Sequence, residues 1–82
     1  MNSNPLHRND ETLYEIYGYD KDLDRLDLLI QLKMQTSLGR LFADQYFTTT
    51  AIAIHSEEIK DIHGQPYDWA ELYVNGIRIT AK

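Results

Sequence analysis

The fold is decided by residues 69–80, which read Trp-Ala-Glu-Leu-Tyr-Val-Asn-Gly-Ile-Arg-Ile-Thr. Asn75 and Gly76 are a preferred pair for a two-residue type I′ turn, because both positions of that turn need a positive φ. The turn sets the opposed pairs of a hairpin: Val74 with Ile77, Tyr73 with Arg78, Leu72 with Ile79, and Glu71 with Thr80. One face of this hairpin is apolar and the other is polar or amphipathic. The segment therefore predicts a C-terminal β-hairpin.

Upstream of the hairpin, helix and strand patterns alternate. Residues 65–68 are expected to form a loop. Residues 56–64 have a serine cap, acids in the first turn and a terminal glycine, which predicts a short helix, with a strand and turn as the alternative. Residues 47–54 contain three threonines followed by alternating alanine and isoleucine. That alternation predicts a strand.

The strongest periodic pattern begins at Asp20 or Asp22, where carboxylates can cap a helix and interact with its dipole. Apolar residues then recur at spacings of three and four: Leu23, Leu26, Ile30 and Met34. Further leucines at 28, 29 and 32 make this segment apolar on nearly all sides. The pattern predicts a long central helix as far as Met34. A further helical turn or two is expected through residues 41–46.

Residues 11–19 are rich in tyrosine and predict a strand, although Asn9 or Asp10 could cap a short helix there instead. Residues 1–9 are polar and are expected to form a flexible tail, and residues 10–82 a single α+β domain. The fold class expected is α+β. One long central helix packs on a small antiparallel sheet that includes the C-terminal β-hairpin.

Composition restricts the function. The chain has 82 residues, a net charge of −5 and basic residues scattered along its length, which argues against direct binding to nucleic acid. It has no cysteine, so zinc thiolates and cysteine nucleophiles are excluded. Its apolar runs, such as residues 28–30, are short, so no membrane segment and no signal peptide are expected. A cytoplasmic location is the expectation.

Chemical motifs are weak throughout. Asp20, Asp22 and Asp24 have the spacing that begins a calcium loop, but the positions that need glycine and glutamate hold Arg25 and Gln31. No two histidines have the i, i+4 spacing of a helical metal site, and no serine stands in a nucleophile elbow. The sequence therefore predicts no catalytic residues, no metal site and no cofactor.

Two surfaces carry binding signals. The first is an acidic, tyrosine-rich segment suited to a basic protein partner, such as a nucleic-acid-binding protein: Tyr14, Tyr17, Tyr19, Asp20, Asp22, Asp24 and Asp27. The second is an excess of apolar residues that predicts a homodimer through Leu26, Leu29, Ile30, Phe42 and Tyr46.

The function predicted is therefore binding to another macromolecule without catalysis. A small acidic chain of this kind is typical of inhibitors or accessory regulators, encoded by phages or plasmids, that act on a host protein or nucleoprotein complex. The first alternative is a small structural or assembly subunit that works by homo-oligomerisation. The second is a compact enzyme with its active site at a dimer interface.

Overall fold

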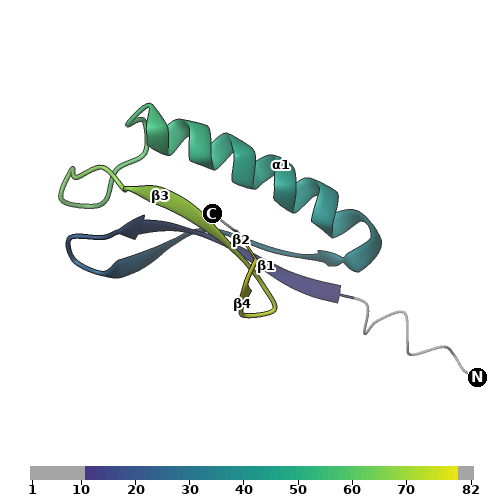
Figure 1. Cartoon of the computed structure of the whole chain (residues 1–82). Coiled ribbons are helices and arrows are strands. Elements are labelled where there is room, and N and C mark those ends of the chain that lie inside the picture. The colour runs from purple at the N-terminus through teal and green to yellow at the C-terminus, as the bar shows by residue number, and fades with distance from the viewer. Residues whose placement is uncertain (1–10, 80–82) are drawn as a thin grey trace, which may run out of the picture.

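The computed structural model describes residues 11–79, as one helix packed on a four-stranded antiparallel sheet (Figure 1). The elements in chain order are β1 (Glu11–Asp20), β2 (Arg25–Gln35), α1 (Thr36–His55), β3 (Trp69–Val74) and β4 (Ile77–Arg78). The strand order in the sheet is β2-β1-β3-β4. The predicted α+β class and the C-terminal hairpin are confirmed. The tail expected at residues 1–9 lies outside the described residues.

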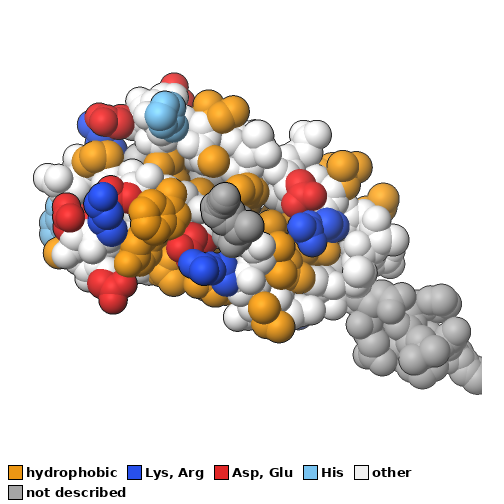
Figure 2. All heavy atoms as spheres, viewed as in Figure 1, with side chains coloured by type: hydrophobic (Ala, Val, Ile, Leu, Met, Phe, Trp, Pro, Cys, Tyr) orange, Lys and Arg blue, Asp and Glu red, His pale blue; other side chains and the backbone are white. Residues whose placement is uncertain are grey.

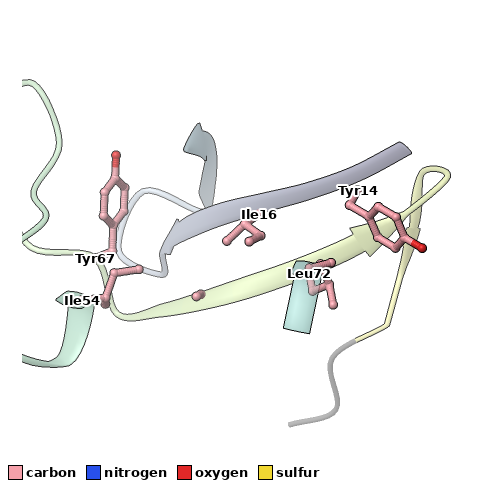
Figure 3. Close-up of a cluster of buried hydrophobic side chains, with 7 residues drawn as sticks. Tyr14, Ile16, Ile54, Tyr67 and Leu72 are labelled. Carbon is pink, nitrogen blue, oxygen red and sulfur yellow. The ribbon is translucent and has the colours of Figure 1, made fainter. Parts of the chain in front are cut away.

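The core lies between α1 and one face of the sheet. Alternate residues of β1, from Thr12 to Asp20, point toward the helix and are buried. Figure 3 shows Tyr14 and Ile16 of β1 beside Leu72 of β3, with Ile54 from the end of α1. The helix contributes a buried stripe at spacings of four, seven and four residues: Gly39, Ala43, Thr50 and Ile54.

Two glycines let aromatic rings approach the backbone closely. A Cβ atom on Gly39 of α1 would lie 2.5 Å from Cε2 of Tyr14, and one on Gly18 of β1 would lie 2.7 Å from Cγ of Tyr67. Both distances are too short for non-bonded carbon atoms. Gly39 lies within α1, and its lack of a side chain makes room for the ring of Tyr14.

The hairpin has the register that Asn75-Gly76 predicts. Tyr73 pairs with Arg78 and Val74 with Ile77, and both turn residues have positive φ, 51° and 83°. The amide of Ile79 donates to the carbonyl of Leu72, which continues the predicted pairing. The last predicted pair includes residue 80, outside the described residues.

The helix predicted from Asp20 or Asp22 to Met34 is wrong. Residues 21–24 form a turn, and the rest of the segment is β2. The pairing with β1 shifts between Ile16 and Tyr17, where Leu29 is the extra residue of a bulge. The extra residue reverses the alternation of side chains along β2. Even-numbered residues therefore lie on one face of the sheet before the bulge and on the other face after it. Because β2 is apolar on both faces, its sequence has the appearance of a helix that is apolar all round.

The strand predicted at residues 47–54 is also wrong, because this segment is the second half of α1. Threonine and isoleucine favour strands by less than about 1 kcal/mol each, and tertiary packing overrides such preferences. Thr50 and Ile54 continue the buried stripe that begins at Gly39. Their contact with the sheet stabilises the helical conformation.

The short helix predicted at residues 56–64 is replaced by turns and irregular structure. Ser56 lies at the C-terminal cap of α1, where its hydroxyl donates to the carbonyl of Ile52. Glu57 has a positive φ of 61°, which is incompatible with continuing a helix. Further along, the carboxylate of Asp61 accepts hydrogen bonds from the amides of His63 and Gln65. These bonds hold the chain in a turn.

Candidate binding surface on the open face of the sheet

Aromatic side chains gather on the face of the sheet opposite α1. Tyr17 and Tyr19 alternate with the buried residues of β1, so they point away from the helix. The pairing of β1 with β3 brings Trp69 opposite Tyr19 and Tyr73 opposite Glu15. The rings of Tyr19 and Trp69 stack with centroids 4.8 Å apart, and those of Tyr17 and Tyr73 meet edge to face at 5.0 Å.

Two leucines of β2 extend this cluster. Leu28 pairs with Tyr17 and Leu26 pairs with Tyr19, so both lie on the same face of the sheet as the tyrosines. Leu26, Leu28 and Trp69 are each 38–48% exposed. We call this cluster the aromatic face: Tyr17, Tyr19, Leu26, Leu28, Trp69 and Tyr73. Within residues 11–79 no second helix covers it.

Glu71 lies in the middle of the aromatic face and is only 6% exposed. Its Oε2 accepts a hydrogen bond from Nε1 of Trp69, and its Oε1 accepts one from the hydroxyl of Tyr73 at 3.2 Å. Arg78 approaches Oε2 more distantly, at 3.4 Å. Burial raises the pKa of the Tyr73 hydroxyl, and the charge of Glu71 raises it further. Glu71 therefore fixes the orientation of both rings through these two hydrogen bonds.

An acidic rim borders the aromatic face at the turn between β1 and β2. We define it as Asp22, Asp24 and Asp68, all exposed. The hydroxyl of Tyr19 donates to Oδ1 of Asp24 at 2.6 Å, and this hydrogen bond raises the pKa of Tyr19. Oδ2 of Asp68 accepts from the amide of Lys21, which joins the two halves of the rim. In Figure 2 charged side chains gather at this end of the molecule.

The seven residues predicted to contact a partner fall into four environments. Tyr17, Tyr19, Asp22 and Asp24 lie on the aromatic face or its rim. Tyr14 is in the core beneath α1. Asp20 is buried and accepts from the amides of Asp22 and Leu23, so its carboxylate shapes the turn.

Asp27, the last of that set, belongs to an ionic network on the helix side of the sheet. Its carboxylate pairs with Arg25 at 3.0 Å and accepts from the hydroxyl of Tyr67 at 2.7 Å. Arg25 also pairs with Asp61 at 3.1 Å. Burial and the hydrogen bond to Asp27 raise the pKa of Tyr67 to about 12. The network borders a cleft and ties β2 to the connection between α1 and β3.

The residues predicted for self-association are also divided. Leu26 lies on the aromatic face, whereas Leu29 and Ile30 are partly buried against the core. Phe42 and Tyr46 are exposed on α1. The prediction therefore combined residues of two separate surfaces with residues that pack against the core.

Trp69, Glu71 and Tyr73 were missed as site residues. The predicted hairpin register places Glu71, Tyr73 and Arg78 on one amphipathic face, and this was the sequence feature that could have identified them as site residues. What the hairpin register could not supply is the pairing of β3 with β1, which joins residues fifty or more positions apart. That pairing brings the two pairs of rings together.

No protein-family model, curated protein or solved structure matches the chain. Within residues 11–79 no three acidic or histidine side chains are arranged to hold a metal ion. No helix within residues 11–79 is both long enough and apolar enough to cross a bilayer. The function therefore has to be inferred from the surface of the protein itself.

Proposed function

We propose that this protein acts without catalysis, by binding a basic protein partner through the aromatic face, as an inhibitor or accessory regulator. The observation that carries the proposal is the exposed cluster of tryptophan, tyrosine and leucine side chains around Glu71. Tryptophan and tyrosine dominate the binding energy of protein interfaces, because large rings bury much area with few rotatable bonds. Their orientation by Glu71 reduces the entropy lost on binding.

Charge supports a basic partner. The acidic rim lies next to the aromatic face, and the chain carries a net charge of −5. An acidic rim accelerates association with a positively charged protein, and guanidinium groups stack favourably on tyrosine and tryptophan rings. Lysine and arginine side chains of the partner would therefore meet both the rings and the rim.

A nucleic acid fits this surface poorly, although bases can stack on exposed rings. Binding to phosphates depends on lysine and arginine, and the sheet face offers Lys33 and Arg78 against Glu11, Glu15 and Glu71. The acidic rim adds further negative charge. Repulsion of phosphates therefore outweighs stacking.

Affinity capture from the native host with wild-type and variant baits tests the proposal. We expect Trp69→Ala to lose a stoichiometric basic partner that the wild type retains. A suitable control is Ile62→Ala, because Ile62 is 93% exposed and belongs to neither the aromatic face nor the rim. A partner that binds the Trp69 variant as tightly as the wild type would show that the aromatic face is not the contact surface.

The rim is tested separately, with the captured partner in hand. Replacing Asp22 and Asp24 by asparagine is expected to slow association and to flatten its dependence on ionic strength, because steering by charge is lost. Association rates at low and high salt measure this effect. Equal rates for the wild type and the variant would remove the rim from the proposal.

A further inference from the structure

The outer surface of α1 is unusually apolar for a helix that covers a sheet. Several large apolar side chains on it are 44–62% exposed: Leu38, Leu41, Phe42, Tyr46 and Ile52. Figure 2 shows hydrophobic side chains at the surface over α1. A helix at the surface of a protein normally carries charged residues on this side. The only charged residues in the segment 36–54 are Arg40 and Asp44, which form an ion pair with each other at 2.9 Å.

The side chains that point most directly away from the sheet form one row. Leu41, Gln45, Thr48 and Ile52 are spaced by four, three and four residues, so they lie along a single line on the helix. This line is opposite the buried stripe of Gly39, Ala43, Thr50 and Ile54. A shallow hollow lies beside it, lined by Leu41, Asp44, Gln45, Thr48 and Thr49. The row is apolar at both ends and uncharged throughout.

Charge identifies the occupant of this surface. Segments 20–27 and 57–68 hold eight acidic and three basic residues at one end of the molecule, so two copies repel each other there. The outer surface of α1 has no net charge, which allows a second copy to approach. A basic partner gains nothing from a neutral surface. A membrane-surface helix needs several lysine or arginine residues, whereas α1 has one, already paired.

We infer that α1 pairs with α1 of a second copy in antiparallel orientation about a twofold axis. The row is self-complementary in this arrangement. With the axis between Gln45 and Thr48, Leu41 of each copy meets Ile52 of the other, and Gln45 meets Thr48. The two helices form the middle of the dimer and the sheets lie outside. Since the aromatic face is on the opposite side of each sheet from α1, the dimer carries two such faces pointing outward.

The oligomeric state in solution tests this inference independently of any partner. Contact between two single helices is a small interface, so we expect dissociation in the micromolar range. Sedimentation equilibrium of the wild type between about 1 and 100 µM should show the mass rise from 9.6 kDa to twice that value. A wild-type protein that remains at 9.6 kDa over the whole range would overturn the inference.

Charge substitutions test the proposed register. Leu41→Glu and Ile52→Lys are each expected to weaken the dimer at least about tenfold, since each places a charge against an apolar side chain of the other copy. The double variant is expected to recover most of the affinity, because opposite charges then meet twice across the axis. Recovery also shows that the single variants do not act by unfolding.

A matched control uses the other side of the sheet. Leu28→Lys changes a leucine of similar exposure on the aromatic face, and it should leave the dimer unchanged. Dissociation by Leu28→Lys but not by Leu41→Glu would overturn the inference and assign self-association to the aromatic face. Loss of the dimer in both single variants without recovery in the double variant would overturn the register.

Discussion

Oε2 of Glu71 accepts a 2.9 Å hydrogen bond from the indole nitrogen of Trp69, on the side of the sheet opposite α1. A carboxylate that is 6% exposed at a sheet surface is uncommon, because removing its charge from water costs free energy. Here the indole, the Tyr73 hydroxyl and Arg78 surround it. The aromatic face is therefore built around a polar centre.

Removing this centre should loosen the aromatic face. We expect Glu71→Ala to lower the free energy of unfolding by about 1–3 kcal/mol, since the indole and the hydroxyl lose their acceptor. Trp69 is the only tryptophan, so its fluorescence reports both unfolding and its own environment. Denaturant titrations measure the effect, with the exposed Glu58→Ala as control. The same unfolding midpoint for Glu71→Ala and Glu58→Ala would contradict this role.

Gly39→Ala tests the contact between α1 and Tyr14. In an exposed helix this change stabilises by up to about 1 kcal/mol. Here the added methyl group would overlap the Tyr14 ring, so we expect a net loss of about 1–3 kcal/mol. Thermal unfolding measures it, and the combination with Tyr14→Leu should recover part of the loss. A Gly39→Ala protein that melts above the wild type would show that the ring does not pack there.

Asp61 should make stability depend on acid pH. The backbone hydrogen bond from Gln65, with help from His63 and Arg25, holds the pKa of Asp61 below its ordinary value of 3.8. The unfolded chain therefore takes up a proton first, and the stabilisation present above pH 3.8 is lost as pH falls through the folded pKa. Asp61→Asn should have a lower free energy of unfolding than the wild type at neutral pH. Its free energy of unfolding should also depend less on pH in the acid range. Parallel profiles for both proteins would contradict this assignment.

Tyr67 should make stability depend on alkaline pH, with stability falling as the pH rises. Its pKa rises from 10.0 to about 12 on folding, mainly because the hydroxyl is buried and also because it donates to Asp27. Its stabilising contribution is therefore complete below pH 10 and is lost as pH rises toward 12. Denaturant midpoints across this range should fall less steeply for Tyr67→Phe than for the wild type. Identical slopes would mean that Tyr67 ionises equally in the folded and unfolded chain.

The sequence predicted the fold class and the hairpin but not the identity of β2. Its apolar residues at 26, 28, 30, 32 and 34 do alternate, which is a strand pattern. Leu23 and Leu29 add spacings of three residues to this pattern, which is typical of a helix. The bulge at Leu29 lets β2 be apolar on both faces, against the core and beside the tyrosines. A local pattern cannot separate such a strand from a buried helix.

The candidate site was predicted in part for a related reason. Tyr17, Tyr19, Asp22 and Asp24 lie within eight residues of one another, so their sequence alone indicated a common surface. Trp69 and Tyr73 join them only through the pairing of β1 with β3. Long-range pairing of this kind depends on the whole fold. It leaves no trace in the spacing of residues along the chain.

The strand order has a consequence for how the chain acquires its structure during synthesis. Tyr14 of β1 pairs with Leu32 on one side and with Val74 on the other. The first pairing needs only a short turn, so β1 and β2 can associate on the ribosome as soon as both have emerged. The second waits for β3 and closes a much longer loop, which slows folding. Until β3 arrives, the inner edge of β1 is exposed to other chains, and the nascent protein is most prone to aggregation in that interval.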